Sequence, residues 1–370
     1  MFYWLEYFKD DTAKLFTRFV HCSIETMNKT VYTFDPSHVE HTTSGHPEHK
    51  GRLERVWKVL EESGLSGRLT RLETPEADME HIKVVHSTRY VDHLHYMVHQ
   101  GLSYLDPDTY CTQHSLEVAL RGVGGLLNIT DAVLSGQADN GMALQRPPGH
   151  HARPHAAMGF CLFGNVAIAA KYARRKFGLE RVLVLDFDVH HGNGTQEMLY
   201  DDPNILFMSV HGAPPFYPES GFIQETGREE GEGFTVNVPL LPGAGDETYL
   251  SVFRKVFAPL VARFKPEAIF VSAGYDAHWM DPMAHMHLST AGFDAMILEL
   301  MAWADQYANG RLIATLEGGY HVNALAHSVA HTLTLLQNPD TRLEDPFGRY
   351  KDGEMHAEEL INSIAHFWRV

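Results

Sequence analysis

Residues 181–194 read RVLVLDFDVHHGNG. The first part of this stretch, RVLVL, is an apolar run of the kind found in parallel strands that are covered by helices on both faces. The run passes directly into acids, histidines and glycines. Two further segments, NILFMSV (204–210) and EAIFVSA (267–273), have the same apolar character. Together these segments predict an α/β fold with a parallel sheet.

Strand-like and helix-like runs alternate through most of the chain. Pro47 suits the first position of a helix, and Gly64 would end that helix. Its apolar face would consist of Leu53, Val56, Trp57 and Leu60. We expect strands at 30–34, 141–144, 181–185, 205–210, 235–238, 268–273 and 312–316. We expect further helices at 89–100, 116–135, 165–177, 247–264, 290–308 and 323–336.

The chain reads as one large domain with two additions. No linker, repeat or low-complexity stretch divides residues 29–337, so we expect a single domain there. Residues 1–28 open with aromatic and acidic side chains, whereas a secretory signal opens with basic ones. We interpret them as an N-terminal appendage, in which Met27 is a candidate natural start. Residues 338–370 are more polar, and we expect a C-terminal arm packed on or near the domain.

Composition limits the class of protein. Of the 370 residues 44% are hydrophobic, which is enough for a large core. No apolar run reaches the roughly 18 residues of a membrane-spanning helix. Three cysteines are too few for a disulfide framework, which favours a reducing, cytoplasmic location. The net charge of -17 disfavours direct nucleic-acid binding and favours cationic partners, although such a charge can also serve solubility alone.

Ionisable side chains and glycines follow four of the expected strands. The strings are RPPGHH (146–151), DFDVHHGNG (186–194), GYDAH (274–278) and EGGY (317–320). Ligands of open parallel sheets bind outside the carboxyl ends of the strands. The four strings are therefore expected to form one site.

The string at 186–194 suggests a metal. Alternate residues of an extended segment face the same way, so Asp186, Asp188 and His190 can project to one side. Asp188 and His190, joined by Asp276, would provide three ligands and leave a position open, as in catalytic zinc sites. Two carboxylates make the metal a weaker Lewis acid, so a separate general base is expected. The pair His150–His151 supplies candidates.

Five strings resemble the histone deacetylase family, and more closely its class II-like members and the bacterial deacetylase-like amidohydrolases. They are RPPGHHA (146–152), GFCLFGNVAIAA (159–170), DFDVHHGNGTQ (186–196), SAGYDAH (272–278) and LEGGY (316–320). The resemblance implies the arginase/deacetylase fold, a single α/β domain whose central parallel sheet has about eight strands flanked by helices. It also implies zinc-dependent hydrolysis of an N-acyl amide, typically acetyl-lysine, to acetate and a free amine.

The resemblance also implies roles for single residues. Asp188, His190 and Asp276 match the ligands of one zinc ion per chain. His151 matches the general base and acid, and His150 matches its electrostatic partner. The remaining catalytic matches are Asp186, which orients His150, Asn193, which orients His151, and Tyr320, which stabilises the oxyanion.

Substrate and cation sites follow from the same resemblance. Gly159 and Phe160 resemble one wall of the acyl-lysine channel, Phe216 would supply the opposite wall, and Met283 lies farther along the channel. A structural potassium ion would be bound by Asp186, Asp188 and Ser209 together with backbone carbonyls. Gly164 departs from the family, because an asparagine is common there, but this change removes no ligand.

Several alternatives stay open at this point. The substrate could be an acyl-lysine protein or peptide, an acetylpolyamine or another small N-acyl amine, and the chain could form a homo-oligomer. Relatives that prefer polyamines place an acid where this chain has Met283, which favours acyl-lysine. A non-catalytic acyl-lysine binding protein and a two-metal ureohydrolase are the rival classes. Other histidines are interpreted as a channel-rim loop (His38, His41, His46 and His49) or as rim and neighbouring positions (His278, His285 and His287). Asp106 and Asp108 match the place where relatives hold the substrate backbone with an acid.

Overall fold

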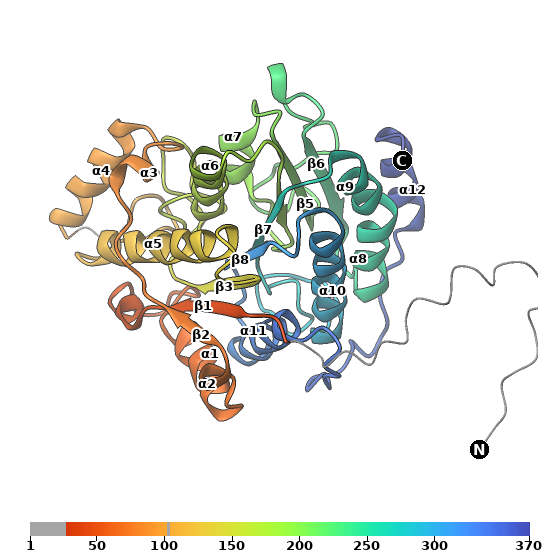
Figure 1. The fold of residues 1–370 in the computed structure, drawn as a ribbon, viewed down its shortest axis with the longest axis horizontal. Helices are drawn as coiled ribbons and strands as arrows, with labels where there is room; N and C mark the ends of the chain where they lie inside the picture. The colour runs from red at the N-terminus through yellow and green to blue at the C-terminus, as the bar shows by residue number, and fades with distance from the viewer. Residues whose placement is uncertain (1–26, 102–103) are drawn as a thin grey trace, which may run out of the picture.

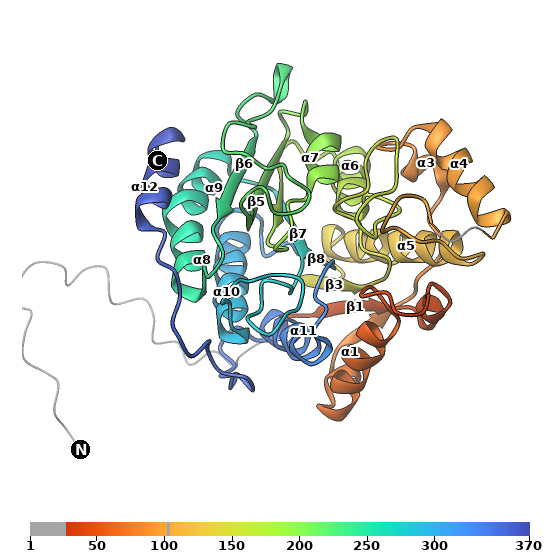
Figure 2. The same ribbon diagram turned by 180° about the vertical axis from the view of Figure 1, so that it is seen from behind.

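The computed structural model describes residues 27–101 and 104–370, and in them eight parallel strands form a single sheet. The strand order is β2-β1-β3-β8-β7-β4-β5-β6, and helices cover both faces (Figures 1 and 2). The predicted parallel α/β sheet is confirmed. The strands are β1 (Thr30–Phe34), β2 (Thr70–Leu72), β3 (Asn140–Leu144), β4 (Val182–Asp186), β5 (Ile205–Gly212), β6 (Thr235–Leu240), β7 (Ala268–Ala273) and β8 (Leu312–Leu316).

Two apolar clusters, one on each face of the sheet, make up the core. Alternate residues of β4 serve opposite clusters: Leu183 and Leu185 pack in one, and Val182 and Val184 pack in the other. The first cluster is covered by α1 (Gly51–Glu62), α8 (Asp246–Val252), α9 (Ala258–Phe264), α10 (Thr290–Tyr307), α11 (Val322–Gln337) and α12 (Glu358–Phe367). The second is covered mainly by α3 (Met79–Ile82), α4 (Thr88–His99), α5 (Ser115–Leu134), α6 (Asn165–Phe177) and α7 (Asn193–Leu199).

Strand register brings the polar strand ends together. In the sheet β3, β8, β7 and β4 are consecutive neighbours. Asp186 at the end of β4 is paired with Ser272 of β7, and Ser272 is paired with Thr315 of β8. The loops that follow these four strands therefore leave the sheet side by side at its carboxyl edge. This is the position at which the sequence predicts the site.

The helix predicted to begin at Pro47 begins later, at Gly51. In the turn before it the side chain of Glu48 is fully buried and binds Arg52 and Arg146, and Nδ1 of His49 accepts a hydrogen bond from the Gly51 amide at 3.1 Å. The predicted end of this helix is confirmed, since Gly64 follows it with a left-handed φ of 69°. The predicted helix at 247–264 contains a π-helical turn, Phe253–Phe257, between α8 and α9. Sequence patterns missed β2, α2 (Leu65–Arg68), α3, α7 and α12, most of which are short.

The C-terminal residues are part of the packed structure. Glu354 accepts hydrogen bonds from the amides of Glu247 and Thr248 at the start of α8, at 3.0 and 2.8 Å. Ile361 and Ile364 of α12 are buried in the same apolar cluster as α8. The appendage predicted at 1–28 lies outside the described residues, except for Met27 and Asn28. Within the part of the chain that the structure describes, no helix is both long and apolar enough to span a membrane.

Candidate active site

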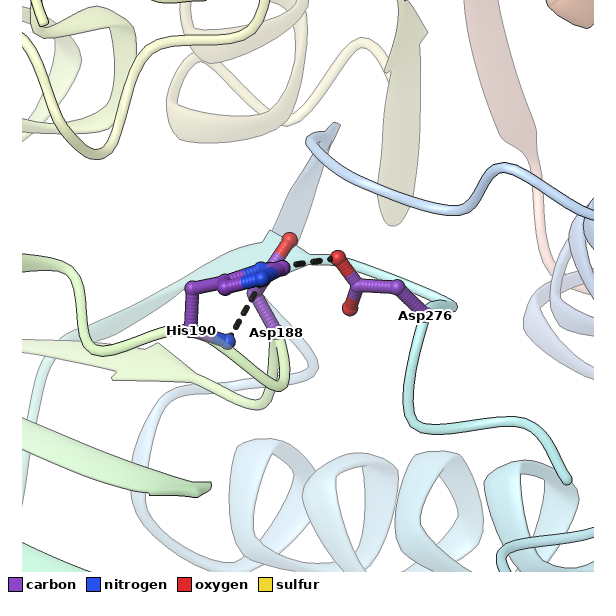
Figure 3. Close-up of side chains that lie close together, drawn as sticks. All are labelled: Asp188, His190 and Asp276. Atoms are coloured by element: carbon purple, nitrogen blue, oxygen red, sulfur yellow. Dashed lines mark hydrogen bonds and ion pairs between the residues drawn. The ribbon is translucent and has the colours of Figure 1, made fainter. Parts of the chain in front are cut away.

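Asp188, His190 and Asp276 converge at the carboxyl edge of the sheet (Figure 3). One ligand atom of each lies within 4.8 Å of the others. Nδ1 of His190 is 3.1 Å from Oδ1 of Asp188 and 3.1 Å from Oδ2 of Asp276. All three residues are buried. Two carboxylates and one imidazole around a small buried space suit a divalent metal ion such as zinc, which binds these oxygen and nitrogen donors.

Backbone contacts fix the two carboxylates. Oδ1 of Asp276 accepts the Val189 amide at 2.9 Å, so the β7 loop is bound to the β4 loop. Oδ2 of Asp188 accepts the Gly318 amide at 2.8 Å, which joins the β8 loop to both. A Cβ atom at Gly318 would collide with the carboxylates of Asp276 and Asp188, so the close approach requires glycine.

The His150–Asp186 pair lies beside this triad. Nδ1 of His150 is 3.0 Å from Oδ2 of Asp186, and both side chains are buried. Burial opposes protonation of His150, but the carboxylates of Asp188 and Asp186 outweigh it and raise its pKa to about 10. The two carboxylates therefore favour the protonated form of His150. The Glu317 carboxylate accepts the Gly149 amide at 2.6 Å and so fixes the loop before His150.

The neighbouring His151 has the opposite character. Burial lowers its pKa well below the usual value, and the positive charge of His150 lowers it further. Nδ1 of His151 is 2.7 Å from Oδ1 of Asn193. An amide oxygen only accepts, so Nδ1 carries the hydrogen and the neutral ring keeps a free electron pair on Nε2. His151 thus has the tautomer and protonation state of a general base.

Tyr320 lies over the guanidinium of Arg52, which is 4.9 Å from the centre of its ring. Arg52 also donates to the carbonyls of Gly319 and Glu317, at 2.7 and 2.6 Å. Burial raises the pKa of the Tyr320 phenol well above 10, so the hydroxyl keeps its proton. Arg52 is held in place by the carboxylate of Glu48, which accepts a hydrogen bond from Nη1 of Arg52 at 3.0 Å. Sequence patterns did not predict this contact.

Aromatic rings surround the metal triad. Phe160 packs edge-on against Tyr320, with ring centres 5.9 Å apart. Phe216 lies flat on His190, with ring centres 5.0 Å apart and planes 13° apart. Tyr217, which the sequence analysis missed, is edge-on to His151 at 5.2 Å and is 37% exposed. The sequence feature that could have identified Tyr217 is its position next to Phe216 in the string FYP (216–218).

Phe160 itself has a left-handed backbone, with a φ of 69°. This conformation is unfavourable for a residue with a side chain and occurs mostly where function or surrounding contacts require it. The Phe160 amide donates to Oγ1 of Thr109 at 3.0 Å, which holds the strained residue. The preceding Gly159 also has a left-handed φ, and a Cβ atom there would overlap the ring of His151.

An open cavity of about 820 Å³ lies beside Tyr320. Its lining includes His46, His49, Lys50 and Pro282, so it lies between the turn before α1 and the loop that follows β7. Met283 follows Pro282 and is half-buried. The expectation that His46 and His49 belong to a rim loop fits this lining.

The rim interpretation of His38 and His41 is wrong. Both side chains are buried, 3% and 1% exposed. Nδ1 of His41 is 2.7 Å from Oγ of Ser115, and burial lowers its pKa to about 3. A helix pattern or a polar loop composition cannot distinguish a buried neutral histidine from an exposed one. His278 is buried as well.

The remaining predicted positions are distributed around the site. The carboxylate of Asp106 accepts the Asp108 amide at 3.0 Å, and the Asp108 carbonyl faces Nε2 of His46 at 2.9 Å. Ser209 is paired with Asp186 across β5 and β4, and its hydroxyl is 2.8 Å from Nδ1 of His211. His285 is exposed, and His287 stacks on Tyr350 with ring centres 3.7 Å apart.

Comparison with known proteins gives one consistent family. Residues 46–336 match the family model described as the histone deacetylase domain. A probable deacetylase of Archaeoglobus fulgidus is 37% identical over 353 residues, covering 91% of this chain and 98% of that protein. The histone deacetylase-like amidohydrolase of Pseudomonas aeruginosa is 40% identical over 277 residues, covering 75% of this chain and 73% of that protein.

A third relative is the polyamine deacetylase HDAC10 of Mus musculus. It is 41% identical over 307 residues, covering 78% of this chain and 44% of that protein. The crystal structure of the HDA15 HD domain superposes with a TM-score of 0.79 and is 32% identical, covering 83% of this chain and 91% of that one. The fold is thus the arginase/deacetylase fold, and the chain belongs to the histone deacetylase family.

Proposed function

We propose that this protein is a zinc-dependent deacylase that hydrolyses an N-acyl amide, with acetyl-lysine as the preferred substrate. The observation that carries the proposal is the position of Nδ1 of His190 between the carboxylates of Asp188 and Asp276. The histidine pair and Tyr320 adjoin this triad. Membership in a deacetylase family supports hydrolysis of an acyl amide as the reaction.

Asp188, His190 and Asp276 would hold the zinc ion. When bound, zinc supplies a Lewis acid for the acyl carbonyl and lowers the pKa of a coordinated water. Because two of the three ligands are carboxylates, we expect this activation to be incomplete, so a neighbouring base is needed. A structural potassium ion on Asp186, Asp188 and Ser209 is the second cation that we propose.

The acid–base work falls to His151. Its neutral ring accepts the proton of the attacking water at Nε2, while Asn193 holds Nδ1–H in place. The same Nε2–H then donates its proton to the nitrogen of the leaving amine. His150, whose protonated form is favoured by Asp188 and Asp186, would add positive charge where the negative charge of the tetrahedral intermediate develops.

Tyr320 would bind the developing oxyanion. Its phenol keeps the proton at working pH because burial raises its pKa. The hydroxyl can therefore donate to the carbonyl oxygen as negative charge develops on it. Phe160, Phe216 and Tyr217 would enclose the aliphatic stem of the substrate by apolar burial.

The alternative substrate is an acetylated polyamine. The relative HDAC10 is described as a polyamine deacetylase, which favours this alternative at the level of the family. Met283, an apolar residue in the loop after β7, favours the uncharged stem of acyl-lysine in this chain. We keep acyl-lysine as the proposal, together with a cytoplasmic location and a catalytic domain at 29–337.

The direct test is hydrolysis of a fluorogenic acetyl-lysine peptide and of acetylspermidine by the purified protein, with and without a zinc chelator. We expect turnover that the chelator abolishes and added zinc restores. His151→Ala should be nearly inactive with zinc still bound, because the base is lost and the ligands are intact. A zinc-loaded wild type that hydrolyses neither substrate would favour a non-catalytic acyl-lysine binding protein.

A further inference from the structure

Asp281 is a buried acid for which the proposed reaction has no use. It lies in the loop between β7 and α10 and is 5% exposed. Its Oδ2 atom accepts the amides of Tyr320 and His321, at 2.6 and 2.9 Å. Its Oδ1 atom accepts the Met283 amide at 3.0 Å. One carboxylate therefore joins the backbone of the oxyanion residue to the backbone of the loop that carries Met283.

The burial of Asp281 is costly. Among the residues that the structure describes, no ion pair joins Asp281 to a lysine, arginine or histidine. A buried carboxylate whose partners are backbone amides alone lowers stability unless those bonds are all made. Burial, and after it the charge of Asp276, raises the pKa of Asp281 to about 7. All three bonds to Asp281 are made, but its raised pKa means that burial still disfavours the ionised form, so packing alone accounts for the residue poorly.

The segment that carries Tyr320 needs external support. Gly318 and Gly319 precede it, and Gly319 has a φ of 118°, where glycine is conformationally free. On the amino-terminal side the segment is held by Arg52, through the carbonyls of Glu317 and Gly319, and by the carboxylate of Asp188. On the carboxyl-terminal side the backbone amides of Tyr320 and His321 are held by Asp281 alone.

Capping of helix α11 does not explain these bonds. The helix begins at Val322, and its N-cap His321 uses its own Nδ1 to accept the Ala324 amide at 3.2 Å. The two amides that Asp281 binds precede the helix. The carboxylate thus serves the loop that carries Tyr320.

We propose that Asp281 is a positioning residue that fixes the Tyr320 hydroxyl for oxyanion binding and couples its position to the Met283 loop. This inference rests on the proposed role of Tyr320. An asparagine at 281 keeps one acceptor oxygen and replaces the other with an NH₂ group. It cannot serve both the Met283 amide and the amides of Tyr320 and His321. The phenol should then move away from the carbonyl it binds.

The test is a double-mutant cycle of Asp281→Asn with Tyr320→Phe, measured as kcat and KM with zinc content and melting temperature recorded for each protein. We expect Asp281→Asn to lower kcat by about 10- to 100-fold, the effect of misplacing a catalytic group by about 1 Å, with KM little changed and zinc retained. In the Tyr320→Phe background the same substitution should change kcat less than about twofold, because no hydroxyl is left to position.

Asp345→Asn is the matched control. The Asp345 carboxylate also accepts three backbone amides, from Phe347, Gly348 and Ala291, and none of them belongs to Tyr320. We expect it to lower the melting temperature with kcat unchanged. If Asp281→Asn does not fold, Asp281→Glu enters the same cycle, because it keeps the charge but displaces the oxygens by one methylene.

Each outcome decides between the two claims. If the fold-losses of kcat in Asp281→Asn and Tyr320→Phe multiply in the double variant, Asp281 acts independently of Tyr320. That result would assign Asp281 a merely structural role and overturn the inference. Wild-type kcat in the Asp281 variants, with Tyr320→Phe impaired, would overturn it too and leave the proposed function standing. Full activity in Tyr320→Phe would instead overturn the proposed mechanism, and the inference with it.

Discussion

Two buried acidic clusters of this protein differ in how their charge is balanced. In the first, Glu48 is fully buried and binds the guanidinium groups of Arg52 and Arg146. In the second, Asp188 and Asp276 are fully buried, and their only ion-pair partners in the described part of the chain are histidines. In the first cluster the carboxylate is paired with permanent cations, whereas the second has the charge and geometry to bind a cation.

The comparison explains why two similar sets of residues have different consequences. Burial opposes ionisation of Glu48, but Arg146 and Arg52 outweigh it and hold its pKa well below the usual range. At Asp276 burial and the neighbouring Asp188 charge raise the pKa, whereas His150 and His190 outweigh burial at Asp188 and lower its pKa. The buried charge of Glu48 therefore supports the fold, whereas the charge of Asp188 and Asp276 is available to a cation.

The largest stability effect is expected at Glu48. Glu48→Gln leaves Arg52 and Arg146 buried without their counter-charge, which typically costs about 3–5 kcal/mol. Urea unfolding of the wild type and of Glu48→Gln measures this loss of stability. The loss should be the same with zinc bound and after chelation. A change below about 1 kcal/mol would show that the two arginines do not depend on the Glu48 charge.

A smaller effect is expected for substrate choice. Met283→Glu should favour acetylspermidine over acetyl-lysine by about 1–2 kcal/mol, the scale of one charge-assisted contact. The ratio of kcat/KM for the two substrates measures this shift, with Met280→Glu on the same loop as a control. A wild type that already prefers acetylspermidine would place the enzyme among the polyamine deacetylases.

The metal cluster should respond differently from the Glu48 cluster. In the zinc-free protein Asp276→Asn is expected to change the free energy of unfolding by less than about 1 kcal/mol, because it removes a charge that has no arginine or lysine partner. Zinc should then stabilise the wild type and leave the variant unaffected. A loss in the zinc-free variant as large as that of Glu48→Gln would erase the distinction between the clusters.

The pH dependence of stability sharpens the same contrast. The folded-state pKa of Glu48 lies below that of the unfolded chain, so its contribution is present above about pH 4.5 and is lost as the pH falls further. As the pH falls from about 6 to about 3, the free energy of unfolding should therefore decrease less steeply for Glu48→Gln than for the wild type. Parallel pH curves for the two proteins would argue against the assigned charge of Glu48.

Some of this architecture could be predicted because its causes are local. The strand RVLVL and the acids that follow it are neighbours in sequence, so both the parallel sheet and the triad Asp188, His190 and Asp276 could be inferred from strand ends. The pairing of Glu48 with Arg146 joins residues 98 positions apart across loops of irregular shape, and no periodic pattern encodes it.

The same limit explains the errors near the first helix. The sequence interpretation placed Pro47 in a helix because proline suits a first turn. The helix starts only at Gly51, after a turn whose Glu48 side chain is buried between two arginines, one of them distant in sequence. His41 was assigned to the rim for a related reason, since its burial against Ser115 depends on a helix 74 residues away in sequence.

Hydrolysis by this protein is proposed to depend on a zinc ion that Asp188, His190 and Asp276 bind. Adding zinc stepwise to the chelated wild type, to Asp188→Ala and to Asp276→Ala, while bound zinc and acetyl-lysine hydrolysis are measured together, tests this dependence. We expect activity of the wild type to rise in proportion to bound zinc and to stop at one ion per chain, and both variants to gain neither. Full zinc occupancy in the two variants, or full activity in the chelated wild type, would contradict the account.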